Sequence, residues 1–320
     1  MVKILVNDGM HADGILLLEE AGYQVDTEKI PQDQLADKLP DYDVIVVRSA
    51  TKVRKDLIEK CPKLKIIARG GVGLDNIDVE FARSRDITVM NTPAASSQSV
   101  AELAFAHMFS LARSLHAANR AMPTEGNTNF KGLKKSYSKG SQLRGKTLGI
   151  IGFGRIGQET ARIGVALGMN VIPVDPQIDS ADIDINVFNN DDVRLSVKLP
   201  TGDWEEMLAK ADFISLHVPS LGKPLIGETE FQKMKNGVIV INAARGGIID
   251  EDALLQALES GKVAAAGLDV FENEPAPRAE LLQHPNISLS PHIGASTHEA
   301  QANIGLELAD KIIAYFGDDK

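Results

Sequence analysis

The chain has 320 residues, of which 43% are hydrophobic, so it is long and apolar enough for the cores of about two domains. With 44 acidic against 34 basic residues the net charge is −10, which argues against binding nucleic acid or a membrane surface through bulk charge. The single cysteine, Cys61, excludes an internal disulfide and is typical of the reducing cytoplasm. We expect Cys61 to be a half-buried structural residue before Pro62, at the end of a helix.

The chain begins with MVKILVNDG, which turns polar too soon for a signal peptide. No later apolar run approaches the roughly 20 residues that span a bilayer, so we expect a soluble, cytoplasmic protein. Strands are predicted at 3–8, 42–49, 64–71 and 87–93, and helices at 12–22 and 54–61. The strands are rich in Val and Ile and lack period-2 alternation, which is typical of a parallel sheet covered on both faces.

The middle of the chain has a different texture. The mostly apolar stretch 99–122 contains no Gly or Pro and predicts one long helix that packs between two domains. The stretch 123–146 is polar, and from Lys131 to Lys146 it holds six basic and no acidic residues. Two interpretations stay open for it. It is either a solvated loop, or an arm that crosses to a partner subunit or reaches a phosphate, with Lys134 or Lys135 as the cation.

The alternation of strands and helices restarts at residue 147. The stretch 147–168 predicts a strand, a tight turn and a helix, and further strands are predicted at 170–176, 211–219, 237–247, 263–271 and 287–294. A last helix is predicted at about 296–316, and the acid-rich stretch 176–203 is predicted as an irregular surface excursion. Two successive units of this kind predict an α/β fold with two doubly wound parallel-sheet domains.

The turn at residues 152–157 carries the strongest motif. Gly152, Gly154 and Gly157 have the GxGxxG spacing between a strand and a helix, and Asp175 ends the next strand. This context is the dinucleotide fingerprint. Gly152 would permit the tight turn, Gly154 the approach of the pyrophosphate, and Gly157 the packing of helix on strand. The helix start would offer free N–H groups to the phosphates.

Asp175 predicts which dinucleotide binds. A carboxylate at this position can accept both ribose hydroxyls of NAD and would repel the 2′-phosphate of NADP. No Lys or Arg follows in DPQID to bind that phosphate. The predicted cofactor is therefore NAD.

Polar residues end several of the later apolar runs. They are His217, Arg245, Asp269 and His292, with Glu274 five residues after Asp269. Because ligands of open parallel sheets bind at the carboxyl ends of the strands, we expect these residues to converge. Arg245 could hold a substrate carboxylate with two parallel hydrogen bonds. A histidine suits proton transfer near pH 7, and a carboxylate such as Glu274 would orient His292 and favour its charged form.

Four stretches, GFGRIG, INAARGGIIDEDAL, AGLDVFENEP and SPHIGAST, occur in this order and resemble the NAD-dependent D-2-hydroxyacid dehydrogenases over nearly the whole chain. The resemblance implies that Arg245, Glu274 and His292 form the catalytic set. His292 would take the hydroxyl proton during oxidation and return it during reduction, while Glu274 would tune His292. Arg245 would bind the carboxylate and polarise the reacting oxygen. Asp269 would hold the carboxamide while a hydride moves between substrate C2 and nicotinamide C4.

The resemblance also implies a discontinuous architecture. A flavodoxin-like substrate domain would comprise 1–98 plus 293–320, with a Rossmann cofactor domain inserted at 99–292. The helix at 99–122 and the last helix would form a hinge, and closure would exclude water. Members of the family are commonly dimers through the cofactor domain, so we expect a homodimer.

The predicted contacts can be collected by ligand. The cofactor contacts are Gly152, Gly154, Arg155, Ile156, Gly157, Asp175, His217, Pro219, Ala243, Asp269, His292 and Gly294. The substrate contacts are Arg48, Ser49, Arg69, Gly70, Gly71, Arg245 and His292. No metal site is predicted.

The substrate prediction rests on a narrower resemblance. VVRSATKV, ARGGVGLDNID, VMNTP and PHIGASTHEAQ resemble the branch of the family that oxidises 3-phospho-D-glycerate to 3-phosphohydroxypyruvate at the start of serine biosynthesis. Arg48 and Arg69 end strands of the first domain and match positions that look like phosphate and carboxylate contacts in that branch. Because the chain ends near residue 320, we expect it to lack the C-terminal domains by which some members sense serine.

Two alternatives are kept. The first is a dehydrogenase or reductase of an unphosphorylated acid such as hydroxypyruvate, glyoxylate or D-lactate. The second is an NADH-sensing binding protein that resembles the family's transcriptional corepressors, against which the intact Arg–Glu–His set speaks.

Overall fold

The computed structural model describes residues 1–186 and 194–317. The chain divides into two compact units. Unit 1 comprises Met1–Ser99 and Ala295–Lys320, and unit 2 comprises Val100–Gly294. Unit 1 is therefore built from both ends of the chain, and unit 2 is inserted between them.

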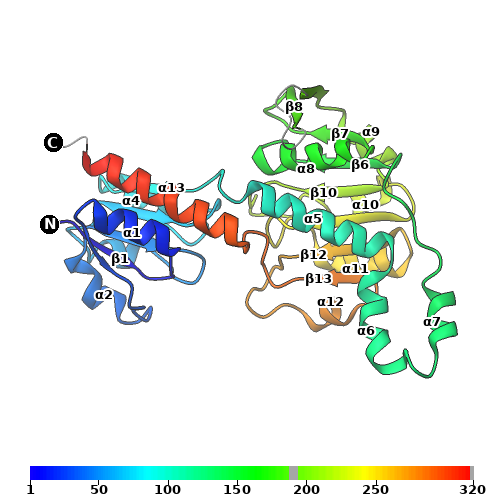
Figure 1. Ribbon diagram of the computed structural model, residues 1–320, viewed down its shortest axis with the longest axis horizontal. Coiled ribbons are helices and arrows are strands. Elements are labelled where there is room, and N and C mark those ends of the chain that lie inside the picture. Colours follow the sequence, from blue (N-terminus) through cyan, green and yellow to red (C-terminus); the bar gives the residue numbers. More distant parts are fainter. Residues whose placement is uncertain (187–193, 318–320) are drawn as a thin grey trace. The chain divides into compact units, whose positions relative to one another are not determined.

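Unit 1, whose first part is blue to cyan and whose last helix is red in Figure 1, has a parallel sheet. The strand order is β2-β1-β3-β4-β5, which is the order of flavodoxin-like sheets. Its strands are β1 (Lys3–Val6), β2 (Gln24–Asp26), β3 (Val44–Val47), β4 (Ile66–Arg69) and β5 (Thr88–Asn91). Its helices are α1 (Ala12–Glu20), α2 (Leu35–Lys38), the 3-10 helix η1 (Leu39–Asp41), α3 (Lys55–Ile58), α4 (Val79–Ser84) and α13 (His298–Gly317). All four strands predicted in this region are present, and the short β2 was not predicted.

Alternate residues of each strand in unit 1 enter different cores. Ile45 and Ile67 pack with side chains of α2, α3 and α4 on one face of the sheet, and Val44 and Val46 pack with α1 and α13 on the other. This burial on both faces explains why the strand sequences show no polar alternation. Cys61 is 1% exposed, more buried than predicted, and desolvation by burial raises its pKa to about 11.

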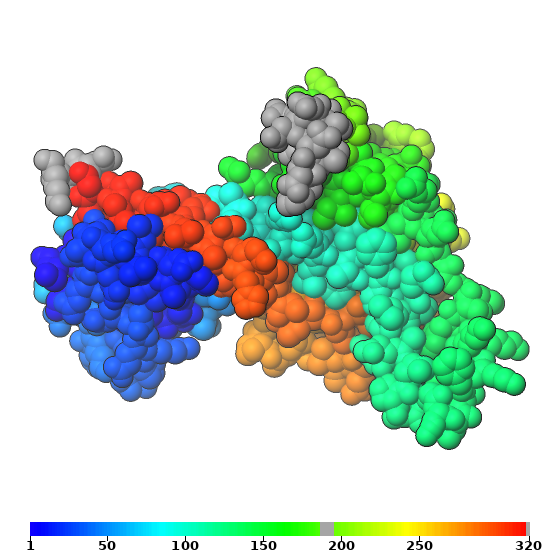
Figure 2. All heavy atoms as spheres, in the orientation of Figure 1, coloured from blue at the N-terminus to red at the C-terminus, as the bar shows by residue number. Residues whose placement is uncertain are grey.

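Helix α13 lies along α1 within unit 1, as Figure 2 shows in red and blue. The two helices approach so closely that a Cβ on Gly14 would lie 2.5 Å from the carbonyl oxygen of Gly305. On its inner side α13 buries Ile304, Leu308 and Ile312 against the sheet. The last segment of the chain thus completes a core that the first segment begins.

Unit 2 has a six-stranded parallel sheet in the order β13-β12-β11-β10-β6-β7. Its strands are β6 (Thr147–Ile151), β7 (Asn170–Val174), β10 (Phe213–Leu216), β11 (Val238–Asn242), β12 (Val263–Leu268) and β13 (Ile287–Leu289). Its helices are α6 (Leu115–Glu125), α7 (Phe130–Ser136), α8 (Arg155–Ala166), α9 (Trp204–Lys210), α10 (Glu228–Lys233), α11 (Glu251–Glu259) and α12 (Ala279–Gln283), with α5 (Ser97–Ala112) entering from unit 1. The strand order reverses between β6 and β10, and ligands of Rossmann sheets bind at such a switch point. This is the predicted α/β fold with a Rossmann domain inserted into a flavodoxin-like one.

The single helix predicted at 99–122 is wrong. Helix α5 ends at Ala112, Ser114 adopts a φ of +52°, and α6 follows. A serine in the left-handed region breaks the helix without the glycine or proline that would have marked the turn in the sequence. Of the two interpretations of 123–146, the solvated loop is wrong in its first part, because α6 continues through Pro123 and α7 follows, with Lys134 and Lys135 exposed on it. The arm that reaches a partner subunit or a phosphate stays a prediction.

The irregular excursion predicted at 176–203 is wrong as well. Residues 180–200 contain an antiparallel hairpin of β8 (Ser180–Asn186) and β9 (Arg194–Pro200). Ile183 of β8 is 1% exposed and packs into the core of unit 2, while its neighbours Asp182 and Asp184 are exposed. This period of two was visible in SADIDIN, but the many acids outweighed it. Residues 187–193 lie outside the described residues.

Candidate active site

The glycine-rich turn joins β6 to α8 at the switch point of the unit 2 sheet. Gly152 has a φ of +91°, and a Cβ on it would lie 2.5 Å from the carbonyl oxygen of His217. A Cβ on Gly157 would collide with the carbonyl oxygen of Gly152. By contrast, nothing lies within 4 Å of a Cβ built on Gly154. Gly152 and Gly157 are therefore required by close packing, whereas the space beside Gly154 is open to a ligand.

The start of α8 has the features of a phosphate site. It begins directly after Gly154, and the first N–H groups of a helix have no partner within the helix. Together with the positive end of the helix dipole they favour an anion. The side chain of Arg155 is exposed at this helix start. These residues fit the pyrophosphate of a dinucleotide.

Asp175 links the end of β7 to the glycine-rich turn. Its Oδ2 accepts a hydrogen bond from the N–H of Phe153 at 2.7 Å, and its Oδ1 accepts from Gln177 at 2.8 Å and Ile178 at 3.2 Å. An ionised carboxylate has about four acceptor positions, so about one remains for a ribose hydroxyl. The backbone contacts were not predicted from the sequence.

His217 follows β10 and lies against α8. Its Nε2 contacts the hydroxyls of Thr160 at 3.0 Å and Ser215 at 2.9 Å, and its buried Nδ1 has no hydrogen-bond partner among the described residues. Desolvation by burial lowers the pKa of His217 to about 3, so the ring is neutral at physiological pH. Pro219 is exposed beyond it, and Ala243 is 8% exposed after β11.

Arg245, Glu274 and His292 follow β11, β12 and β13, which are neighbours in the sheet. The structure brings Glu274 and His292 into contact, with Oε2 of Glu274 2.7 Å from Nδ1 of His292. The Nε2 of His292 makes no hydrogen bond to another described residue, and 44% of the side chain is exposed. The ring thus has one nitrogen held by a carboxylate and the other accessible.

Opposing effects set the protonation of Glu274. Desolvation by burial would raise its pKa, but hydrogen bonds from His292 and from the N–H of Phe271 outweigh it, with the charges of His292 and Arg245 adding to them. The pKa of Glu274 is therefore lowered, and the group is a carboxylate at neutral pH. The charge of Arg245 is the smallest of these effects.

The turn that carries Arg245 is held by Asn242, the last residue of β11. Its side-chain amide donates to the carbonyl of Arg245 at 2.9 Å and accepts from the N–H of Ala244 at 3.1 Å. The next residue, Gly246, is packed so closely that a Cβ would collide with the carbonyl oxygen of Phe271. The loop after β11 and the loop that leads to Glu274 are thus in backbone contact.

Glu251, at the start of α11, supports the same loop and was not predicted. It is 6% exposed, and its Oε1 accepts from the N–H of Glu272 at 2.9 Å. Burial raises its pKa, partly opposed by that hydrogen bond. Glu251 follows Asp250, which caps α11, and acids are common in the first turn of a helix, so the sequence does not indicate this contact.

Asp269 is 1% exposed and binds the turn that contains His292. Its carbonyl oxygen accepts from the N–H of His292 at 2.8 Å. Its carboxylate accepts from Ile293 at 2.8 Å, from Gly294 at 2.9 Å and from the hydroxyl of Ser290 at 2.6 Å. The sequence predicted Asp269 and Gly294 as cofactor contacts, and the structure gives both a role in fixing this turn.

The other predicted substrate residues belong to unit 1. Val47 pairs with Arg69 across β3 and β4, so Arg48 and Arg69 emerge from neighbouring strand ends. Asn76, 8% exposed and not predicted, links them, because its amide donates to the carbonyl of Arg48 at 2.8 Å and accepts from Nε of Arg69 at 3.0 Å. Ser49 is exposed beside them. Gly70 and Gly71 are buried after β4.

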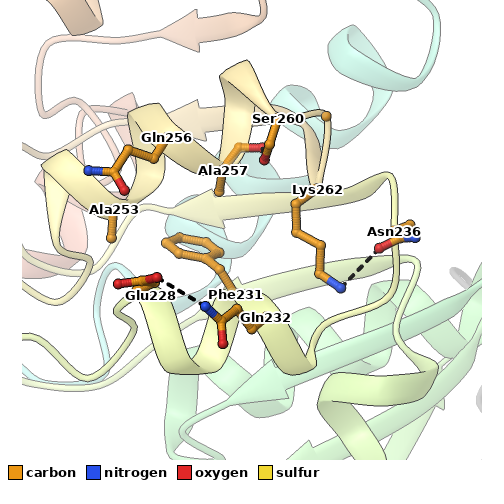
Figure 3. Close-up of a pocket in the computed structure, with 10 residues that line it drawn as sticks. Glu228, Phe231, Gln232, Asn236, Ala253, Gln256, Ala257, Ser260 and Lys262 are labelled. Atoms are coloured by element: carbon orange, nitrogen blue, oxygen red, sulfur yellow. Dashed lines mark hydrogen bonds between the residues drawn. The ribbon is translucent and has the colours of Figure 1, made fainter.

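A pocket of about 580 Å³ lies elsewhere in unit 2, between α10 and α11 (Figure 3). Its lining residues are Glu228, Phe231, Gln232, Asn236, Ala253, Gln256, Ala257, Ser260, Gly261 and Lys262. Asn236 and Lys262 precede β11 and β12, so the pocket is at the amino ends of these strands, opposite the edge that carries Arg245 and Asp269. It holds none of the predicted site residues.

Residues 1–186 and 194–317 contain neither a metal-binding cluster nor a membrane span. No group of three or more His, Cys, Asp or Glu side chains among them could hold a metal ion. None of the helices they form is long and apolar enough to cross a membrane.

Comparison with known proteins finds a family and several close relatives. Residues 105–294 match the NAD binding domain of D-isomer specific 2-hydroxyacid dehydrogenases. A hydroxypyruvate reductase of Thermotoga maritima is 44% identical over 98% of both chains. A D-3-phosphoglycerate dehydrogenase of Methanocaldococcus jannaschii is 45% identical over 98% of this chain. The chain spans 57% of the length of that relative, and the same share of those from Archaeoglobus fulgidus and Bacillus subtilis.

Solved structures give the same picture. A glyoxylate reductase from Paecilomyes thermophila superposes with a TM-score of 0.83 at 30% identity, covering 100% of this chain and 96% of that one. The apo-structure of D-lactate dehydrogenase from Escherichia coli, at 24% identity and a TM-score of 0.77 over 99% and 98% of the two chains, shares the fold.

Proposed function

Because the chain belongs to the family of D-isomer specific 2-hydroxyacid dehydrogenases, we propose that it is an NAD-dependent dehydrogenase of 3-phospho-D-glycerate, with 3-phosphohydroxypyruvate as the product. Membership makes it an NAD-dependent oxidoreductase of 2-hydroxy acids. The observation that supports the phosphorylated substrate is the pair of arginines at adjacent strand ends of unit 1, Arg48 and Arg69. Relatives named D-3-phosphoglycerate dehydrogenase support it further.

The Glu274–His292 pair supplies the proton chemistry. Bound NAD would supply the acceptor for the hydride from substrate C2. Glu274 holds Nδ1 of His292, which leaves Nε2 to take the hydroxyl proton in oxidation and to return it in reduction. An always-charged guanidinium at Arg245 binds the substrate carboxylate and polarises the reacting oxygen. The N–H groups at the start of α8 bind the cofactor's pyrophosphate, and Asp175 binds its adenosine ribose.

In this proposal the cations of unit 1 recognise the phosphate. The chain has a net charge of −10, so a phosphorylated acid needs local positive charge to bind. Arg48 is held through its backbone by Asp8 and Asn76, which leaves its guanidinium to be aimed at a ligand. Unit 1 is thus proposed as the substrate domain.

The experiment follows NADH absorbance with 3-phosphohydroxypyruvate, hydroxypyruvate, glyoxylate and pyruvate, for the wild type and for Arg48→Gln. We expect the phosphorylated acid to be preferred. Loss of one charge-assisted hydrogen bond should raise its KM by about 10- to 100-fold and leave the KM for hydroxypyruvate unchanged. Arg83→Gln, which removes an exposed cation paired with Glu80 in the same unit, is the control. Equal use of all four acids by the wild type would reject the phosphate site.

A second candidate is reduction of hydroxypyruvate. It is favoured by the 44% identity to a hydroxypyruvate reductase that this chain matches over 98% of its length. The same assay distinguishes it, because hydroxypyruvate would then be turned over at least as well as the phosphorylated acid. Arg48→Gln would change neither KM.

We also propose a homodimer through the cofactor domain. Large apolar side chains are exposed on three consecutive helices of unit 2, namely Phe109 on α5, Leu115 and Met122 on α6, and Phe130 on α7. Exposed apolar groups gathered on adjacent elements are typical of an interaction surface. Light scattering after gel filtration would give the mass in solution, and Leu115→Lys should shift it toward the monomer.

A further inference from the structure

The side chains of Ser288, His107 and Ser290 form a chain of hydrogen bonds that ends at Asp269. None of the three is part of the predicted site. His107 on α5 is 5% exposed and places Nδ1 2.9 Å from the hydroxyl of Ser288 on β13. Its Nε2 is 2.9 Å from the hydroxyl of Ser290, which lies 2.6 Å from Oδ1 of Asp269. The ring sits on β12 at Gly267, where a Cβ would come within 2.7 Å of the Cβ of His107. The fold thus makes room for an imidazole at this point.

The directions of these hydrogen bonds are fixed from the Asp269 end. The carboxylate of Asp269 also accepts backbone N–H groups, and a carboxylate only accepts, so the hydroxyl of Ser290 donates its single proton to it. The oxygen of Ser290 then accepts, and Nε2 of His107 must carry the proton. The Nδ1 of the neutral ring is therefore an acceptor, and Ser288 donates to it. All donors point toward Asp269.

The ring stays neutral because of its surroundings. Desolvation by burial lowers the pKa of His107; the charge of Asp269 opposes this, and His116 lowers the pKa further. A neutral ring with a defined tautomer is what the one-way chain requires.

Asp269 in turn fixes the backbone of His292. It binds the N–H groups of His292, Ile293 and Gly294 with its carbonyl, Oδ1 and Oδ2. His292 has a φ of +55°, which a non-glycine residue adopts only where its surroundings hold it. With Ser290 also bound, Oδ1 is saturated, and Oδ2 has about one acceptor position left.

We propose that Ser288, His107 and Ser290 are positioning residues that hold the Asp269 carboxylate, and through it the His292 turn and the acceptor that receives the NAD carboxamide. The inference deepens the proposed function and rests on it, in that Asp269 is taken to face the nicotinamide. Neither His107 nor the serines touch the reacting atoms. Their contribution is the orientation of Asp269.

The first test is a double-mutant cycle with two readouts, the Kd for NADH measured by fluorescence without substrate, and kcat. His107→Leu should weaken NADH binding and lower kcat by about 10-fold, because the hydroxyl of Ser290 loses its alignment. His107→Gln, whose amide can still donate to Ser290, should recover most of the loss. In the Ser290→Ala background, His107→Leu should change the Kd for NADH and kcat by less than about two-fold, since the connection to Asp269 is already broken.

The matched control is His116→Leu. His116 also bonds to the segment that precedes β13, at the carbonyl oxygen of Pro285. Its charge affects the pKa of His107 less than burial does, and it makes no hydrogen bond to His107, to the two serines or to Asp269. It should leave the Kd and kcat unchanged. Equal effects of His107→Leu in the two backgrounds, or an effect no larger than that of His116→Leu, would overturn the proposal.

The second test reads the tautomer directly. ¹⁵N spectra of histidine-labelled protein at pH 7.5 should show a neutral His107 with the proton on Nε2 and, in Ser290→Ala, a loss of that preference. A charged ring or a proton on Nδ1 in the wild type would refute the assigned direction. Both the binding readout and the spectra work without turnover. If the wild type turns over no 2-oxo acid but the NADH binding and the spectra are as expected, the proposed function alone is rejected. If the enzyme is active but the binding and the spectra differ from those expected, the positioning role alone is rejected.

Discussion

The contact between Glu274 and His292 decides what proton chemistry unit 2 can perform. Glu274 receives two donors, the N–H of Phe271 at 3.0 Å and Nδ1 of His292 at 2.7 Å. Both favour the carboxylate, which is why its pKa is lowered although burial alone would raise it. An acceptor fixed in this way keeps the proton of a neutral ring on Nδ1 and leaves the Nε2 lone pair free.

Glu274→Gln should reverse that arrangement. If the amide oxygen keeps the N–H of Phe271, its NH₂ group faces Nδ1 and forces the ring proton onto Nε2, where it blocks proton uptake. We expect kcat for oxidation to fall by about 10²- to 10⁴-fold. Steady-state kinetics between pH 6 and 9 measure it. Glu272→Gln, an exposed neighbour, is the control, and a Glu274→Gln enzyme as active as this control would contradict the assignment.

His217 should make the protein sensitive to acid. Its pKa is about 3 in the folded protein and about 6.5 when unfolded, so between these values the unfolded chain binds the extra proton. The free energy of unfolding then decreases as pH falls, by about 2 kcal/mol from pH 7.5 to pH 5 for this one group.

Urea unfolding at pH 7.5 and pH 5 tests this. His217→Gln should be less stable than the wild type at pH 7.5, because the contacts with Thr160 and Ser215 change. Between pH 7.5 and pH 5, the free energy of unfolding of His217→Gln should fall by about 2 kcal/mol less than that of the wild type. If the free energy of unfolding falls equally in the wild type and in His217→Gln between the two pH values, His217 is not the group that is buried in its neutral form.

At the residue scale, the sequence draws attention to polar residues that end a strand, but not to the residues that hold those residues in place. Arg245, Glu274 and His292 stood out because parallel strands bring their carboxyl ends to one edge. His107 lies in the mostly apolar stretch 99–122 with nothing in the sequence to single it out, and its serines are 181 and 183 residues away in the chain. Asn76, which links Arg48 and Arg69, likewise belongs to no motif or periodic pattern in the sequence. Such support depends on which elements pack together, which strand periodicity does not encode.

Among the elements, the loops after β11 and β12 act as one. Gly246 contacts the carbonyl of Phe271, and Glu251 binds the N–H of Glu272 two residues before Glu274. A displacement of either loop therefore moves Arg245 relative to Glu274.

Gly246→Ala should reveal this dependence. The new methyl would collide with the carbonyl oxygen of Phe271, so the loops must separate. We expect kcat/KM to fall by about 100-fold or more, because displacements of about 1 Å have effects of this size. NADH binding at the glycine-rich turn should remain. Gly227→Ala, whose methyl would find its nearest atom 3.7 Å away, is the control for stability and activity.

Strands were predicted better than the helices and the hairpin. Val- and Ile-rich runs identify buried parallel strands whatever surrounds them. The break at Ser114 depends instead on tertiary packing, because serine has no intrinsic preference that would announce it. The hairpin of β8 and β9 was hidden by its composition, although Ile183 kept the alternation of a half-buried strand.

In the whole molecule, the two units should respond separately to mutation. Gly14→Val would place a branched side chain against the backbone of Gly305, which overpacks the contact of α1 with α13 in unit 1. Overpacking costs about 1 to 3 kcal/mol. We expect calorimetry to show a lower Tm for unit 1 and fluorescence to show an unchanged Kd for NADH in unit 2. Glu19→Gln, exposed on the same helix, should change neither, and a weakened Kd in Gly14→Val would mean that the units are coupled.

The place of α13 in unit 1 has a consequence for biosynthesis. On the ribosome, β1, β3 and β4 emerge before unit 2, but Ile304, Leu308 and Ile312, which cover one face of their sheet, are translated after it. About 200 residues of unit 2 lie between, which takes roughly 10 to 40 s at bacterial and eukaryotic elongation rates. During that delay the apolar face of the nascent sheet stays uncovered, while unit 2, continuous in sequence, can already fold. The N-terminal segment is therefore the part of the polypeptide that a chaperone would be expected to hold during synthesis.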